Sequence, residues 1–272
     1  MTASVLTSAI LEARRNGRPA LIPFLTGGFP DRESFWPALE ELARSGADVI
    51  EIGVPFSDPV ADGPVVAAAS LKALEDGVDL AWILDGLAAR RLGVPLVLMS
   101  YANPLLQYAW PLTDPAAVLQ ARVEESLAHF ARKAEEAGIS GIIVPDMPLE
   151  EYGPFLRALA GTSLDPIALV GPNTSPERMA RYARVAGGYV YVVSVLGTTG
   201  VREGLPQEVV QTLGRARRAF GLPLALGFGI KSPDQLAALG AEPDAVIIGS
   251  ALLAHLGAGG DCRGFMAPWL AY

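Results

Sequence analysis

The stretch from residue 51 to residue 64 carries carboxylates in positions that favour acid–base chemistry. Glu51 lies inside an apolar run that predicts a buried strand over 48–53. A carboxylate among apolar strand neighbours is costly unless it is paired or protonated. The loop that follows holds three prolines and two more carboxylates, Asp58 and Asp62, which is more order than a plain connection needs. We therefore interpret this stretch as part of a reactive site.

Each of these residues also has a simpler interpretation when taken alone. Glu51 would serve only the fold if it paired with an arginine, and Asp62 in Asp-Gly-Pro would be an ordinary turn former. Tyrosines such as Tyr101 and Tyr191 more often pack than react. The interpretation as a site depends on whether the fold gathers these side chains in one place.

Eight short apolar runs rich in β-forming residues predict strands, and helix-forming stretches separate them. Near-continuous apolar strands are typical of a parallel sheet that is covered on its faces. The predicted strands are Ala20–Thr26, Asp48–Gly53, Pro95–Tyr101, Gly141–Asp146, Ile167–Gly171, Tyr189–Ser194, Leu224–Gly229 and Ala245–Gly249. The predicted helices are Arg32–Ser45, Val65–Leu92, Glu124–Ala137, Pro176–Val185, Gln207–Phe220 and Pro233–Leu239.

This alternation predicts an α/β fold, a (β/α)8 TIM barrel that forms a single domain over 1–272. A doubly wound open sheet is the alternative, but the Gly-x-Gly-x-x-Gly fingerprint of its first turn is missing from the segment 26–30. Two additions are predicted: an amphipathic N-terminal helix within 1–15, and an extra helical segment after the third strand, which begins near 113–115.

The composition excludes several classes of protein. The chain has 272 residues, about half of them apolar, and a formal net charge of −8 that argues against a nucleic-acid partner. Cys262 is the only cysteine, so no disulfide framework is expected. No apolar run is long enough to span a membrane, and the N-terminal segment does not resemble a signal peptide. We expect a soluble, cytoplasmic protein.

In a TIM barrel the active site lies at the carboxyl ends of the strands, and the last two strands commonly hold a phosphate there. The segment 227–229 and the pair Gly249–Ser250 fit this role, because glycine lets a ligand approach backbone N–H groups. The alternative is that these glycines only allow tight turns. The three lysines and two histidines lie away from the predicted strand ends, so neither a Schiff-base lysine nor a metal centre is expected.

The chain resembles the tryptophan synthase α subunit family. The resemblance covers nearly the whole chain in order, and the segment 51–64 is its most specific part. Further matches are Thr26–Pro30, Tyr101–Pro104, Asp146–Pro148, Gly188–Tyr191, Gly197–Gly200, Gly227–Ile230 and Gly249–Ser250. It implies a retro-aldol lyase that cleaves indole-3-glycerol phosphate to indole and glyceraldehyde 3-phosphate.

The resemblance also implies roles for individual residues. Glu51 would transfer protons, Asp62 would hold the indole N–H, and Tyr191 would lie beside the glutamate. The phosphate would be bound by Gly200, Gly229, Gly249 and Ser250, and the indole ring by Phe24, Tyr101 and Phe228. Thr199 would meet the aspartate when the loop 195–206 closes over the substrate.

For partners, the resemblance implies a β subunit in an αββα heterotetramer, with Pro55 and Asp58 on the loop that faces it. Pyridoxal phosphate would belong to that partner, and this chain would need no cofactor. The chain departs from the family pattern at 99–100, at 197–200 and in a longer insertion around 110–120.

Two competing functions stay open from the sequence. An indole-glycerol-phosphate synthase would need a catalytic lysine at a strand end, and none is found. A silent subunit that only activates its partner would be expected to lose the pair Glu51 and Asp62, which this chain keeps.

Overall fold

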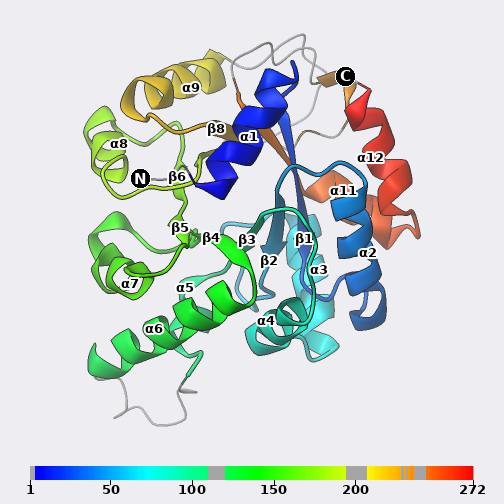
Figure 1. The fold of residues 1–272 in the computed structure, drawn as a ribbon, viewed down its shortest axis with the longest axis horizontal. Coiled ribbons are helices and arrows are strands. Elements are labelled where there is room, and N and C mark those ends of the chain that lie inside the picture. The colour runs from blue at the N-terminus through cyan, green and yellow to red at the C-terminus, as the bar shows by residue number, and fades with distance from the viewer. Residues whose placement is uncertain are drawn as a thin grey trace.

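The computed structural model describes residues 4–109, 120–193, 207–227, 230, 232–235 and 243–271. Nine parallel strands form one sheet in the order β5-β4-β3-β2-β1-β9-β8-β7-β6 (Figure 1). The strands are β1 (Ala20–Thr26), β2 (Ile50–Gly53), β3 (Leu96–Met99), β4 (Ile139–Ile143), β5 (Asp165–Pro166), β6 (Ala168–Val170), β7 (Val190–Val193), β8 (Leu224–Gly227) and β9 (Ala245–Ile248).

The two ends of this sheet meet in the chain itself, because only Ile167 separates β5 from β6. β5 pairs with β4, and β6 pairs with β7. Pro166 has no N–H for a ladder, which interrupts the strand there. Its carbonyl accepts from Gly187 N at 2.9 Å, while Ile167 N donates to Ile142 O at 3.0 Å. The short strand β5 thus precedes the fifth predicted strand, Ile167–Gly171, which contains β6. The TIM-barrel prediction is confirmed.

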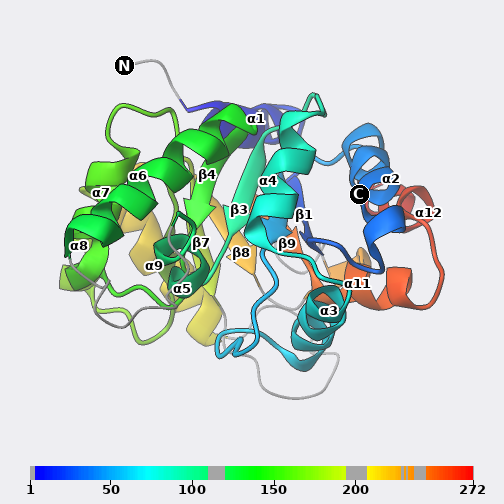
Figure 2. The same ribbon diagram turned by 90° about the horizontal axis from the view of Figure 1, so that it is seen from below.

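The helices cover the outside of the barrel, and α1 lies across one of its ends (Figures 1 and 2). Over the described residues they are α1 (Val5–Arg15), α2 (Arg32–Arg44), α3 (Pro64–Glu75), α4 (Leu80–Ala88), α5 (Ala102–Leu106), α6 (Gln120–Glu136), the 3-10 turn η2 (Leu149–Glu151), α7 (Tyr152–Leu159), α8 (Pro176–Tyr182), α9 (Gln207–Ala219), α11 (Ser250–Gly257) and α12 (Cys262–Leu270).

Several helix predictions are corrected by the structure. The single helix predicted over 65–92 is two helices, because Gly77 adopts a left-handed φ of 74° and ends α3. Asp79 then caps α4 by accepting from Trp82 N at 2.8 Å. α5, α7 and α12 were not predicted as separate helices. The expected helix start at 113–115, and most of the insertion at 110–120, lie outside the described residues.

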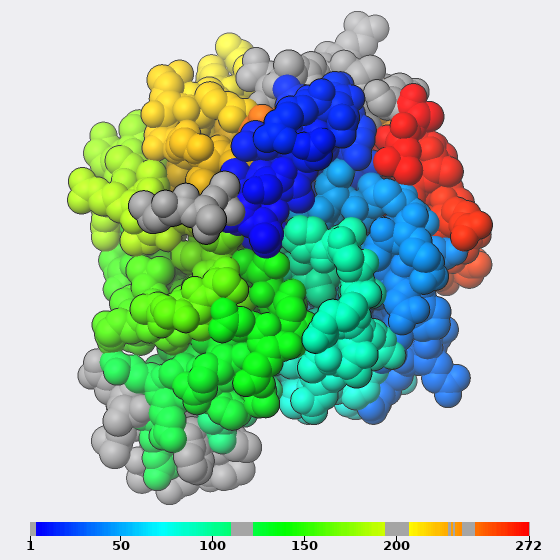
Figure 3. Space-filling model, in the orientation of Figure 1, coloured from blue at the N-terminus to red at the C-terminus, as the bar shows by residue number. Residues whose placement is uncertain are grey.

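The amino-terminal helix α1 closes the floor of the barrel, the end opposite to the loop between β2 and α3 (Figure 2), and it crosses the centre of the face seen in Figure 3. Leu6 and Ile10 are fully buried. Gly141 makes room for this plug, since a Cβ there would lie 2.7 Å from Leu6 Cδ1. Thr7 Oγ1 donates to Gly188 O at 2.6 Å, which fastens the helix to the start of β7.

Two aspartates at the floor are fully engaged by the backbone and by arginines. Asp48 accepts from Arg18 at 2.6 and 2.9 Å and from Leu21 N at 2.8 Å. Asp244 accepts from Arg217 at 2.7 Å and from Leu224 N at 2.8 Å. These carboxylates tie strand starts together, so they stabilise the fold.

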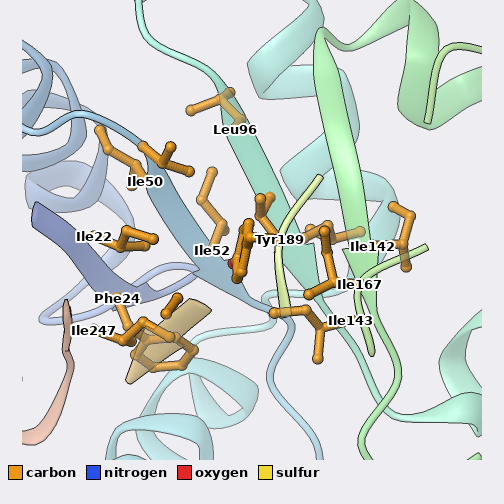
Figure 4. Close-up of a cluster of buried hydrophobic side chains, with 14 of the residues drawn as sticks. Ile22, Phe24, Ile50, Ile52, Leu96, Ile142, Ile143, Ile167, Tyr189 and Ile247 are labelled. Atoms are coloured by element: carbon orange, nitrogen blue, oxygen red, sulfur yellow. The ribbon is translucent and has the colours of Figure 1, made fainter. Parts of the chain in front are cut away.

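Branched aliphatic side chains from many strands fill the core, and the Tyr189 ring lies between them (Figure 4). Among the described residues, no helix is long and apolar enough to cross a membrane.

Candidate active site

Glu51 sits in the middle of β2 with its side chain in the barrel and no exposed surface. Tyr189 donates a short hydrogen bond to its Oε1, and its Oε2 has no hydrogen-bond partner. Burial raises the pKa of Glu51 to about 8, against the opposing effect of the Tyr189 hydrogen bond. At neutral pH this residue is therefore mostly a neutral carboxylic acid with a transferable proton.

Tyr189 is the residue that sequence reasoning missed. The resemblance placed Tyr191 beside the glutamate, but it is the Tyr189 hydroxyl that bonds to it. Strand alternation was the available signal, because positions 189 and 191 share a face and both side chains enter the barrel. Burial raises the pKa of Tyr191 most, and the charges of Glu51 and Asp62 raise it further. Tyr191 therefore stays protonated near both carboxylates.

Asp62 lies in the loop between β2 and α3 and is partly exposed. Tyr101, at the end of β3, donates from its hydroxyl to Asp62 Oδ2 at 3.1 Å. Burial raises the pKa of Asp62, while the Tyr101 hydrogen bond works in the opposite direction. Asp62 is thus oriented by a residue at the end of a neighbouring strand, and its Oδ1 has no hydrogen-bond partner among the described residues.

A cavity of about 220 Å³ opens at the carboxyl ends of the strands. Its lining is mixed: Asp62, Tyr191 and the start of α11 share the cavity with mostly apolar residues. The described residues that line it are Phe24, Ala61, Asp62, Gly63, Val66, Met99, Pro145, Leu169, Tyr191, Val193, Gly227, Ile247, Gly249 and Ser250.

Gly249 and Ser250 bring the start of α11 to this cavity. The first N–H groups of a helix have no partner inside it, and the helix dipole favours an anion at this end. No side chain caps α11, so these N–H groups are not satisfied by the helix cap. This corner suits a phosphate. The Phe24 ring lies between Gly249 and Gly53: a Cβ at Gly249 would lie 3.5 Å from Phe24 Cβ, and one at Gly53 would lie 2.4 Å from Phe24 Cζ.

The other predicted site residues fall into three groups. Thr199, Gly200, Phe228 and Gly229 lie outside the described residues. Pro55 is buried and Asp58 is exposed on the loop after β2, where Ser57 Oγ donates to Asp58 Oδ2 at 2.5 Å. Neither Glu51 nor Tyr101 lines the cavity, but each acts on a residue that does: Tyr101 donates to Asp62, and the charge of Glu51 raises the pKa of Tyr191.

Groups that would serve other chemistries lie elsewhere. No cluster of three potential metal ligands occurs within the described part of the chain. Lys72 and Lys133 lie on α3 and α6, where they pair with Asp76 and Glu136. His129 stacks on Tyr108 with ring centroids 5.5 Å apart, a packing role. Asp146 accepts from Ala102 N, at the start of α5, at 2.8 Å.

Comparisons with known proteins agree on one family. The profile of the family described as "Tryptophan synthase alpha chain" matches residues 10–262. The tryptophan synthase alpha chain of Nitratidesulfovibrio vulgaris is 58% identical over 271 residues, which cover 99% of both chains. That of Solidesulfovibrio magneticus is 55% identical with the same coverage.

Solved structures give the same result. The structure of Mycobacterium tuberculosis tryptophan synthase in space group F222 aligns with a TM-score of 0.86 and 35% identity, covering 99% of this chain and 98% of that one. The tryptophan synthase subunit alpha from Legionella pneumophila aligns with a TM-score of 0.81 and 30% identity, covering 97% and 95%.

Proposed function

The chain belongs to the tryptophan synthase alpha chain family, and from this premise we propose how its own residues carry out the family's reaction. The enzyme is a lyase that cleaves indole-3-glycerol phosphate to indole and glyceraldehyde 3-phosphate in tryptophan biosynthesis. The alpha chain has no cofactor of its own, and it pairs with the β subunit, to which pyridoxal phosphate belongs. We further propose that residues 1–272 form one domain, and that it works in the cytoplasm as part of an αββα complex.

The reaction breaks the bond between indole C3 and the first glycerol carbon. Indole C3 must gain a proton, the ring nitrogen must carry positive charge for a time, and the hydroxyl on the first glycerol carbon must lose its proton as the aldehyde forms. One proton enters and one leaves, so the step needs an acid, a base and a stabilising anion, with no oxidant or metal.

We assign the proton transfers to Glu51. The single observation that carries this assignment is a fully buried carboxyl group with one bonded oxygen and one free oxygen, on a barrel strand. Its raised pKa of about 8 means that it holds a proton to donate to C3 at neutral pH. The carboxylate left behind then accepts the proton of the glycerol hydroxyl. To reach substrate, the side chain must turn toward the cavity that it does not line in this structure.

We assign the stabilisation of the indole cation to Asp62, which faces the cavity. An indole N–H that donates to its carboxylate favours the ionised form, and the developing positive charge strengthens the interaction in the transition state. Tyr191 lies close enough to both carboxylates for their charges to affect its pKa. We assign to its hydroxyl the orientation of the glycerol chain between them.

Two sets of residues in the cavity would bind the two parts of the substrate. Phe24 supplies an aromatic wall for indole, and the start of α11 at Gly249 and Ser250 supplies N–H groups for the phosphate. We retain Thr199, Gly200, Phe228 and Gly229 as proposed contacts, and Pro55 and Asp58 as proposed contacts with the β subunit.

The test is indole release from indole-3-glycerol phosphate by the wild type, by Glu51→Gln and by Glu125→Gln, an exposed exchange on α6, each with and without β subunit. We expect slow release alone, faster release with the partner, and loss only in Glu51→Gln. Wild-type activity in Glu51→Gln would refute the mechanism. No release by the wild type with a competent partner would favour the silent-subunit alternative.

A further inference from the structure

Tyr101 lies at the junction of β3 and α5, where it is 3% exposed. Its backbone position is fixed on the helix side, because Ala102 N donates to Asp146 Oδ1 at 2.8 Å. The resemblance to the family placed Tyr101 in the wall of the indole pocket. In the structure it is absent from the residues that line the cavity, and its contacts are with the loop between β2 and α3.

The hydroxyl of Tyr101 joins two consecutive residues of that loop. It accepts from Ala61 N at 2.9 Å and donates to Asp62 Oδ2 at 3.1 Å. Both interactions use the same oxygen, so the backbone at 61 and the carboxylate at 62 are held relative to each other and to β3. Within the described part of the chain, the bond to Oδ2 is the sole hydrogen bond that orients the Asp62 side chain.

The ring of Tyr101 holds the other end of the loop. It stacks on Phe56 with centroids 4.8 Å apart and planes inclined by 23°. Phe56 follows Pro55 and precedes the exposed Asp58, so it lies inside the segment proposed to face the β subunit. Val60, at the tip of the same loop, is 85% exposed, which leaves its apolar side chain uncovered in the isolated chain.

We propose that Tyr101 is a positioning residue: its hydroxyl sets the orientation of Asp62, and its stack on Phe56 joins Asp62 to the partner-facing loop. This inference rests on the proposed function, in which Asp62 stabilises the indole cation. Contact of the β subunit with the loop would then reach Asp62 through one aromatic ring, with no change in the barrel itself.

Electrostatics supply a readout that a purely structural role would not move. The Tyr101 hydrogen bond favours the ionised form of Asp62 and opposes the effect of burial. Tyr191 from β7 also faces Asp62, and Asp146 from the loop after β4 acts on Tyr101. Neither replaces the lost hydroxyl in Tyr101→Phe, so the pKa of Asp62 must rise in that variant.

The first experiment compares Tyr101→Phe with Tyr152→Phe, which removes a buried hydroxyl on α7 from a residue that does not line the cavity. For Tyr101→Phe we expect kcat to fall about 10–100-fold, because a misplaced catalytic group costs up to about 10²-fold, while KM changes by less than about threefold. The acidic limb of the pH profile of kcat/KM should move to higher pH. Tyr152→Phe should change neither. A raised KM with unchanged kcat and unchanged pH profile would overturn the proposal and leave Tyr101 as a pocket wall.

The second experiment uses Phe56→Leu, which removes the stack and keeps the hydroxyl. We expect the stimulation by β subunit, the ratio of activity with the partner to activity without it, to fall about 2–10-fold, the range of an aromatic pair. Full stimulation in this variant would overturn the link to the partner.

The variant Asp62→Asn distinguishes failure of the positioning inference from failure of the proposed function. If Asp62→Asn is inactive while Tyr101→Phe behaves as wild type, the positioning inference fails and the proposed function stands. If Asp62→Asn keeps wild-type activity, the proposed function itself fails. Adding Tyr101→Phe to Asp62→Asn should cause no further loss, since the hydroxyl acts through that carboxylate.

Discussion

The floor and the centre of the barrel treat buried carboxylates in opposite ways. At the floor, Asp48 and Asp244 each receive an arginine and a backbone N–H, so their charge is matched. In the centre, Glu51 is more deeply buried, yet it has one tyrosine hydroxyl and an oxygen with no partner. The floor thus stabilises the fold, whereas the centre keeps a group that burial makes unfavourable in its charged form.

This difference separates a structural carboxylate from a reactive one within one chain. Burial raises the pKa of the unmatched Glu51 carboxyl, so near neutral pH it holds a proton that it can donate. All three carboxylates are largely buried: Glu51 has no exposed surface, and the side chains of Asp48 and Asp244 are 15% and 13% exposed. They differ most in the number and charge of their hydrogen-bond partners.

The largest expected effect comes from Glu51→Gln, which removes the acid and keeps the shape. We expect indole release to fall at least about 10³-fold, within the range for loss of general acid–base catalysis. The free energy of unfolding, measured in urea at pH 8.5, should stay equal or rise, because the amide carries no buried charge. A marked loss of stability in this variant would place Glu51 with the floor carboxylates.

Asp244→Asn should give the opposite pattern. It weakens the ion pair with Arg217 and a charge-assisted bond to Leu224 N, so the free energy of unfolding should fall by about 1–3 kcal/mol. The kcat of indole release should stay within about twofold. If kcat fell with stability unchanged, the separation between floor and centre would be wrong.

The pH dependence of stability sharpens the same contrast. The pKa of Glu51 is about 8 in the folded chain and near its ordinary value of 4.5 in the unfolded chain, so between these values the folded state binds more protons. The free energy of unfolding of the wild type should therefore fall, relative to Glu51→Gln, as the pH rises from about 4.5 to 8. Below 4.5 the two curves should run parallel. Parallel curves throughout would contradict the raised pKa.

The smallest expected effect is at the phosphate corner. Ser250→Ala removes a hydroxyl at the start of α11 and leaves the N–H groups in place. We expect KM for indole-3-glycerol phosphate to rise about 2–10-fold, as for one lost hydrogen bond of about 0.5–1.5 kcal/mol, with kcat nearly unchanged. Urea unfolding should not distinguish this variant from the wild type. A fall in kcat without a rise in KM would argue against a phosphate at this helix start.

Local elements could be predicted from the sequence, whereas contacts between residues far apart along the chain could not. Eight of the nine strands correspond to predicted runs, because apolar runs and turn residues are local signals, and Glu51 stood out because a carboxylate breaks such a run. The short strand β5 was not predicted, because it consists of Asp165 and Pro166, residue types that are depleted in strands. Tyr189 and the role of Asp146 were missed because their partners, Glu51 and Ala102, lie 138 and 44 residues away. No window of sequence contains both members of such a pair.

The plug formed by α1 has a consequence for the order in which the chain acquires its structure. Thr7 is bonded to Gly188, 181 residues further along. At a synthesis rate of about 5–20 residues per second, roughly 10–40 s separate the appearance of the two on the ribosome. Leu6 can pack against Gly141 once β4 has been made, but the hydrogen bond from Thr7 must wait for Gly188. The attachment of α1 to the start of β7 is therefore a late event in the life of a newly made chain.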